Sequence, residues 1–98
     1  MPIQVHIDPD LADLIPGFLA NKRDDLAMLI EAAKCGDFGT LREIGHRLKG
    51  EGSGYGFERI TQLGGALEQA AMRADRGEVS ELIAALREYL ESIELHFD

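Results

Sequence analysis

One stretch of the chain, from Gly45 to Phe57, carries residue types that could do chemistry together. His46 supplies an imidazole, Lys49 follows three residues later, and glycine occupies five of the thirteen positions. A neutral imidazole leaves one ring nitrogen free to attack a phosphoryl group, which forms phosphohistidine. The added phosphate brings roughly two negative charges, which a nearby cation can offset. The stretch therefore has the composition of a site that carries a phosphoryl group.

The surroundings of His46 in the sequence lack the groups that would generate a phosphoryl group from ATP. There is no carboxylate pair, nucleotide loop or metal cluster beside it. The glycines at 50, 52, 54 and 56 fit neither G-x-G-x-x-G nor the Gly-Lys-Ser/Thr spacing of a phosphate loop. The segment from Gly54 to Ile60 lacks the basic residue and the final aromatic residue of an RNA-recognition strand. We expect no cofactor of the chain's own and no autonomous kinase activity.

Helical geometry predicts where the side chains of this stretch point. At about 100° per residue, the apolar residues that fall nearly opposite His46 are Ile44, Leu48 and Leu41. His46 is therefore expected to face solvent. Its predicted exposed neighbours, all within about 60° of it, are Arg42, Lys49, Gly50 and Ser53. Arg42 and Lys49 would offset phosphate charge, while small residues at 50 and 53 would leave room for another protein. Glu51, at about 140°, is expected to point away.

Four amphipathic helices are predicted to position this site. In the first, from Ile15 to Cys35, apolar residues recur every three or four positions, which leaves Lys22, Arg23, Asp24 and Glu31 for water. Gly36 and Asp37 predict the end of that helix and the cap of the next, which carries His46. A third helix follows Gly56 and ends near Arg76 and Gly77. A fourth is expected from about Glu78 to Ile93, and the segment from Leu95 to Phe97 extends or caps it.

The N-terminal segment is expected to be simpler. Ile3, Val5 and Ile7 alternate with polar residues as in a strand, but the sequence offers no second strand to pair with them, so residues 1–8 are interpreted as an extended arm. Asp8 and Pro9 predict the start of a short helix that runs to about Leu14. The predicted fold is all-α, an antiparallel up-down-up-down four-helix bundle with a short additional N-terminal helix, forming one domain over residues 1–98.

The sequence allows more than one local structure at several positions. The helix of His46 either ends near Gly52 or continues past it, because glycine disfavours helix interiors. The apolar residues Leu11, Leu14, Ile15 and Phe18 form either a docking patch or part of the core. Gly64 and Gly65 are expected to permit close contact between helices. His6 and His96 are interpreted as ordinary solvated side chains.

Composition narrows the classes of function. The chain has 98 residues, 45% of them hydrophobic and 29% charged, as in an ordinary globular domain. Its formal net charge of −8 argues against a nucleic-acid surface. Neither a membrane span nor a signal peptide is recognisable, so we expect a cytoplasmic protein. Cys35 is the only cysteine, which excludes an intrachain disulfide, and it is expected to be a small packing residue near a helix end.

The pattern Gly45-His46-Arg47-Leu48-Lys49-Gly50 resembles that of the histidine-containing phosphotransfer (HPt) domain family. Gly56, ten residues after the histidine, and Leu67-Glu68 on the following helix also fit. So do Asp37-Phe38 and the upstream Phe18-Leu19. The resemblance, to a stand-alone bacterial type, covers roughly residues 8 to 95. It implies a four-helix bundle that exposes a phosphoacceptor, His46, on its second long helix.

The resemblance also implies partners. It implies transfer to and from an aspartate of a response-regulator receiver domain, which supplies the acidic pocket and Mg²⁺. We therefore expect a monomeric relay protein that serves receiver domains and a hybrid histidine kinase. The alternative is a non-phosphorylated helical adaptor that binds the same partners. A third possibility, the phosphoacceptor domain of a chemotaxis-type kinase, is disfavoured by the initiator methionine and the short C-terminal end. The cognate partners and the direction of phosphoryl flow are not specified by the sequence.

Overall fold

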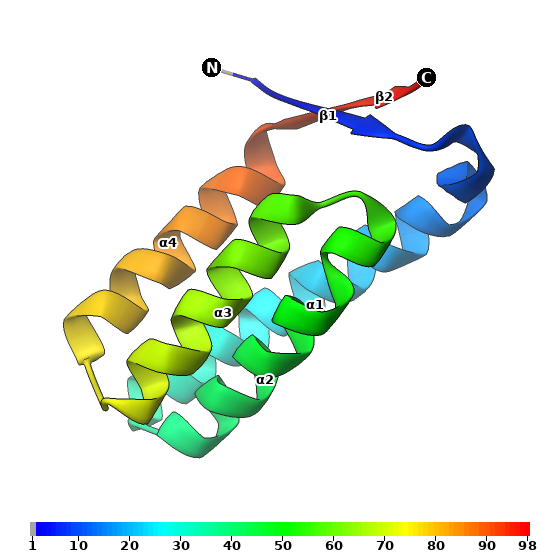
Figure 1. The fold of residues 1–98 in the computed structure, drawn as a ribbon. Coiled ribbons are helices and arrows are strands. Elements are labelled where there is room, and N and C mark those ends of the chain that lie inside the picture. The colour runs from blue at the N-terminus through cyan, green and yellow to red at the C-terminus, as the bar shows by residue number, and fades with distance from the viewer. Residues whose placement is uncertain (1) are drawn as a thin grey trace.

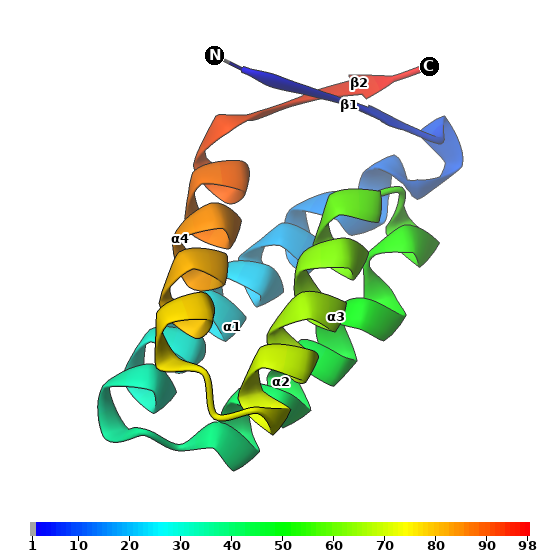
Figure 2. The same cartoon turned by 60° about the vertical axis from the view of Figure 1, so that its left-hand side comes forward.

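The structure, a computed structural model, describes residues 2–98, so Met1 of the predicted arm lies outside the described residues. Residues 2–98 form four α-helices: α1 (Ile15–Cys35), α2 (Phe38–Glu51), α3 (Glu58–Met72) and α4 (Arg76–Ser92). Figures 1 and 2 show them as a bundle in which each helix runs antiparallel to the one before it. Each packs against the next, and α4 returns to α1. The mostly helical, four-helix prediction is confirmed.

The core lies between the four helices and is built from the apolar stripe of each. Its largest fully buried apolar side chains are Ile7, Ile15, Leu29, Leu41, Ile44, Leu48, Phe57, Ile60, Leu63, Leu67 and Leu86. On α2 the buried stripe consists of Leu41, Ile44, Gly45 and Leu48. Because this stripe faces inward, the opposite side of α2, which includes His46, faces outward as helical geometry predicts.

The junction between α1 and α2 follows the predicted signals. Gly36 adopts a left-handed conformation with φ 68° and ends α1. Asp37 caps α2, because its carboxylate accepts hydrogen bonds from the Thr40 backbone N–H at 3.1 Å and the Thr40 hydroxyl at 2.6 Å. The Thr40 hydroxyl, and then its backbone N–H, lower the pKa of Asp37 below its ordinary value. Cys35 ends α1, but its side chain is exposed instead of packed.

The helix that carries His46 does not continue past Gly52. The helix ends at Glu51 with Gly52 as its cap, and a 3-10 helix, η2 (Ser53–Tyr55), follows. A Cβ atom at position 52 would lie 2.6 Å from the Thr61 backbone nitrogen, so only glycine fits there. Gly56 then takes a left-handed φ of 91° and turns the chain toward α3.

Two further helix ends differ from the prediction by a few residues. The third helix ends at Met72, several residues before the expected Arg76 and Gly77. The fourth begins at Arg76, because Asp75 caps it by accepting a hydrogen bond from the Glu78 backbone N–H at 3.1 Å.

The two ends of the described chain form a small sheet, which corrects two predictions. Strand β1 (Ile3–Ile7) pairs in parallel with β2 (Ile93–Phe97), in a register that places Ile3 opposite Ile93. The arm therefore has a partner, and the segment after α4 is a strand instead of a helical extension. No turn residue separates β2 from α4. The change from the helical period to the alternation of a strand was therefore not recognised in the sequence. Figures 1 and 2 show the pair crossing one end of the bundle.

The sheet also changes the interpretation of two histidines. His6 and His96 lie opposite each other in the register, and their rings stack with centroids 5.0 Å apart. The Nδ1 atom of His6 is 3.0 Å from an oxygen of Asp98. Below them, Ile7 is buried and packs on Gly56, where a Cβ would lie 3.0 Å from the Ile7 Cδ1 atom. His6 is thus exposed and His96 half-buried, with their rings paired, and the sheet is joined to the connection between α2 and α3.

The N-terminal part of the bundle holds a further correction. The short 3-10 helix η1 (Pro9–Leu14) precedes α1, and Ile15 and Phe18 belong to the core whereas Leu14 is 55% exposed. Lys22, which the helical pattern assigned to solvent, is completely buried. Its ammonium has two carboxylate partners, which is the condition under which a lysine can be buried. No helix among residues 2–98 has the length and apolarity to cross a membrane.

Candidate functional site

His46 stands on the outer face of α2 with its side chain 73% exposed. Its Nδ1 atom lies 2.7 Å from Oε2 of Glu68, on the neighbouring helix α3. An ionised carboxylate can only accept a hydrogen bond, so Nδ1 must carry the hydrogen. In the neutral ring the other nitrogen, Nε2, then holds the free lone pair. The geometry selects one tautomer of His46 and leaves the lone pair of Nε2 without a hydrogen, as a nucleophile requires.

Close contact between α2 and α3 brings these two side chains together. A Cβ atom at Gly45 would lie 2.8 Å from the Glu68 backbone nitrogen and 2.9 Å from the Gly64 carbonyl oxygen. A Cβ at Gly64 would lie 2.5 Å from the Lys49 backbone nitrogen. Both glycines are therefore needed for the helices to approach this closely, as predicted for Gly64. Gly65 allows an ordinary contact with the Lys49 side chain instead.

Lys49 lies on the other side of the same carboxylate. Its Nζ atom is 3.7 Å from Oε1 of Glu68, so the two oxygens of Glu68 face His46 and Lys49 separately. The Glu68 side chain is only 13% exposed, whereas Lys49 is 54% exposed. Glu68 thus lies between the imidazole and an exposed cation, and a phosphoryl group on His46 would have an ammonium one helical turn away.

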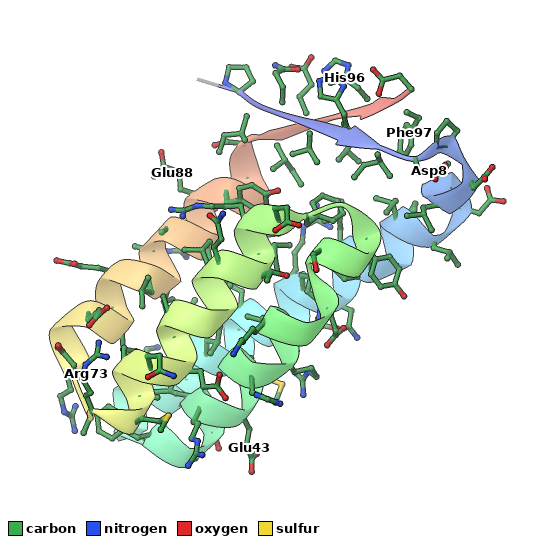
Figure 3. All side chains as sticks on the ribbon, viewed as in Figure 1. Asp8, Glu43, Arg73, Glu88, His96 and Phe97 are labelled. Atoms are coloured by element: carbon green, nitrogen blue, oxygen red, sulfur yellow. The ribbon has the colours of Figure 1, made fainter. Side chains whose placement is uncertain are left out.

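A surface hollow of about 500 Å³ lies beside His46. It is lined by Gly39, Arg42, Glu43, His46 and Glu68. Arg42 and Glu43 form no ion pair within residues 2–98, so both charges are available to a docking molecule. Figure 3 shows Glu43 on α2, at the end of the bundle opposite the strands that carry His96. The hollow is open to solvent, and His46 and Glu68 form part of its wall.

The remaining residues for which the sequence predicted a position relative to His46 are Gly50, Ser53 and Glu51. Apart from its chain neighbours and the local backbone of α2, a Cβ at Gly50 would meet no atom of residues 2–98 within 4 Å, so this side of the imidazole is open. Ser53 lies beyond the end of α2, in η2, and its backbone N–H donates to Thr61 Oγ1 at 2.8 Å. The helical angle that placed Ser53 beside His46 therefore does not apply to it. Glu51 points away and pairs with Lys22 at 3.1 Å.

Glu68 is the site residue that helical projection did not identify. Angles around one helix cannot report a contact with a side chain of another helix. Only the resemblance to the family pattern, through Leu67-Glu68, included this residue. A signal was present, because Glu68 follows Gly64 by one helical turn and so lies on the same face. No group of three or more His, Cys, Asp and Glu side chains in residues 2–98 is arranged to hold a metal ion.

A family model described as the Hpt domain matches residues 13–96, which is nearly the whole chain. No curated protein and no solved structure matches the chain significantly.

Proposed function

The chain belongs to the Hpt domain family, and from this premise we propose that it is a phosphotransfer protein of a two-component phosphorelay. Hpt domains are phosphocarrier modules of two-component signalling and are not autonomous enzymes. His46 accepts a phosphoryl group from an aspartate of one receiver domain and passes it to another. The observation that carries this assignment is the hydrogen bond from His46 Nδ1 to Glu68, which leaves Nε2 free on an exposed face.

The transfer uses this geometry directly. The lone pair of Nε2 attacks the phosphorus of the aspartyl phosphate, a P–N bond forms, and the P–O bond to the aspartate breaks. The aspartate leaves as a carboxylate. The imidazole ring gains positive charge in this step because Nδ1 keeps its hydrogen, and the Glu68 carboxylate stabilises that charge at 2.7 Å. Transfer to the next receiver domain is the reverse reaction, so no proton has to enter or leave Nδ1.

The neighbours of His46 act on the phosphoryl group and on the partner. Lys49 and Arg42 offset the negative charge that phosphorylation adds, and Gly50 leaves clearance for the docking domain. Ser53 contributes, if at all, through η2 and the connection to α3. Mg²⁺ and the acidic pocket belong to the receiver domain. We further propose that the protein is monomeric and cytoplasmic and is served by a hybrid histidine kinase.

Phosphoryl transfer from a labelled receiver domain tests this function. The protein is incubated with phosphorylated receiver domains, and the bound label is examined for the acid lability and base stability of phosphohistidine. We expect His46→Gln to lose all label. His96→Gln, at a half-buried histidine on β2 and away from the site, should keep it. Absence of label on the wild type, or undiminished label on His46→Gln, would refute the relay. Binding to a receiver without label would identify a non-phosphorylated adaptor.

A further inference from the structure

Four charged side chains form a closed ring between α1 and α2, on the side of α2 that faces away from His46. Lys22 Nζ lies 2.8 Å from Asp25 Oδ2 and 3.1 Å from Glu51 Oε2. Arg47 donates a hydrogen bond to the other oxygen of Asp25, and its Nε atom is 3.6 Å from Glu51 Oε1. Each cation therefore contacts both carboxylates. We call these four residues the Lys22 ring.

The α1 half of the Lys22 ring is buried, whereas Arg47 and Glu51 on α2 are partly exposed. Lys22 is completely buried and Asp25 is 3% exposed, and the Lys22 ammonium also lies 5.2 Å from the centre of the Phe18 ring. Desolvation offsets much of the attraction in a buried ion pair, and apolar residues of similar volume often serve stability as well. Separating a buried charge from its partner leaves that charge uncompensated. The ring therefore favours the one arrangement of α1 and α2 in which Lys22 and Asp25 keep their partners.

The ring contacts α2 near the C-terminal end of this helix. Arg47 and Glu51 belong to the last turns of α2, which also hold Lys49 and Gly50. Glycine is a poor helix former, and both Gly50 and the cap residue Gly52 occur here. Gly52 has φ −56°, so the left-handed stop that satisfies many helix ends is missing at this cap. This end of α2 therefore depends on contacts with other helices.

We propose that Lys22 is a positioning residue for phosphotransfer. The Lys22 ring holds the glycine-containing last turn of α2 in helical form, and thereby keeps Lys49 beside Glu68 and His46. Gly50 leaves space at the surface, and Gly52 leaves space for the contact with α3. Neither glycine favours the helix, so the ring stabilises the helical form of this turn from the α1 side. This inference rests on the proposed function for the role of Lys49, whereas the support of the last turn can be measured independently.

Amide hydrogen exchange tests the support of the last turn. Lys22→Met would leave Asp25 buried with one cation and endanger folding, so the first variant is Glu51→Ala. Alanine is a good helix former, which means that loss of helix there reports the lost ring contacts. We expect exchange at Gly50, Glu51 and Gly52 to accelerate about tenfold, with no change near Leu41. The control, Glu81→Ala on α4, removes an exposed carboxylate that forms no ion pair within residues 2–98.

A rescue and a double-mutant cycle complete the test. Gly50→Ala adds a methyl group that meets no atom of residues 2–98 outside the local backbone of α2 and its chain neighbours. It should restore slow exchange in Glu51→Ala. Glu51→Ala should slow phosphoryl transfer from a receiver domain several-fold in the wild-type background but have no further effect in Lys49→Ala. Unchanged exchange, uniformly faster exchange, or rate effects that multiply would overturn the proposal. Absence of label on wild-type His46 would refute the proposed function, while the exchange result would still report on the ring.

Discussion

Glu68 Oε2 accepts a hydrogen bond from His46 Nδ1 at 2.7 Å, although the two residues are 22 positions apart and lie on different helices. The contact is possible because Gly45 and Gly64 let the backbones of α2 and α3 approach each other. The reactive tautomer of His46 therefore depends on how two helices pack, which makes the helix contact part of the site.

Removing the Glu68 carboxylate should alter the imidazole and the transfer rate together. In Glu68→Ala, Nδ1 loses its acceptor, so Nε2 carries the hydrogen in part of the population. We expect labelling of His46 to slow about tenfold, as for the loss of one charged hydrogen bond. Glu68→Gln keeps an acceptor oxygen and should be less affected. Nitrogen-15 NMR of the ring reports the tautomer, and an unchanged tautomer ratio in Glu68→Ala would contradict this role.

Substitution of Gly45 should separate α2 from α3. The Cβ of Gly45→Ala would lie 2.8 Å from the Glu68 backbone nitrogen, and forcing bulk into such a contact costs about 1 to 3 kcal/mol. Gly65→Ala is the matched control, since its Cβ would make an ordinary 3.6 Å contact with Lys49 Cδ. We expect a lower urea midpoint for Gly45→Ala only. Equal effects of the two changes would show that the close contact is not limiting.

Bulk at Gly50 should block the partner without harming the fold. Gly50→Gln adds a side chain where a Cβ meets no atom of residues 2–98 outside the local backbone of α2 and its chain neighbours. It also improves helix propensity by roughly 0.5 to 1 kcal/mol. We expect equal or higher thermal stability, an order-of-magnitude loss of transfer from a receiver domain, and normal labelling by a small phosphodonor such as phosphoramidate. Gly77→Gln, in the first turn of α4, controls for the substitution itself. Normal transfer from the receiver by Gly50→Gln would disprove the clearance role.

The cap of α2 should make stability depend on acid pH. The Thr40 hydroxyl and backbone N–H lower the pKa of Asp37 in the folded protein, so the folded state favours the carboxylate. This contribution is fully present above the aspartate pKa of the unfolded chain, near 4, and is lost as the pH falls through the lowered folded value. Asp37→Asn keeps a capping side chain that does not titrate in this range.

Thermal unfolding of wild type and Asp37→Asn between pH 2 and 6, an interval around the aspartate pKa, measures the effect. The difference between their melting temperatures should narrow in acid as wild-type Asp37 takes up a proton. A difference that stays constant over this interval would show that the cap does not titrate.

Helical periodicity predicted the parts of the structure that depend on one helix at a time. The stripe of Leu41, Ile44 and Leu48 is buried, and His46 accordingly faces outward. Gly36 and Asp37 mark the junction of α1 and α2, because a left-handed stop and a capping carboxylate are local chemistry. Such features need no knowledge of the rest of the fold.

Contacts between elements were not predicted, for identifiable reasons. Lys22 follows Phe18 by four residues and precedes Leu26 by four, so it lies in the apolar stripe of α1, yet its charge assigned it to solvent. Its burial depends on Glu51, 29 positions later. Glu68 reaches His46 only across the contact of α2 with α3. In the same way, β2 is recognisable as a strand only once β1 is beside it, because their pairing joins opposite ends of the chain.

The parallel pairing of β1 with β2 also determines how the molecule responds to force. Because the two strands point the same way, tension applied between the N-terminal side of β1 and the C-terminal side of β2 would slide them past each other along their length. All hydrogen bonds of the ladder then carry the load at once, instead of opening one after another as in a hairpin pulled from its open end. A pull on the two chain ends therefore does not load the four helices, or His46 on α2, until the pairing of β1 with β2 breaks.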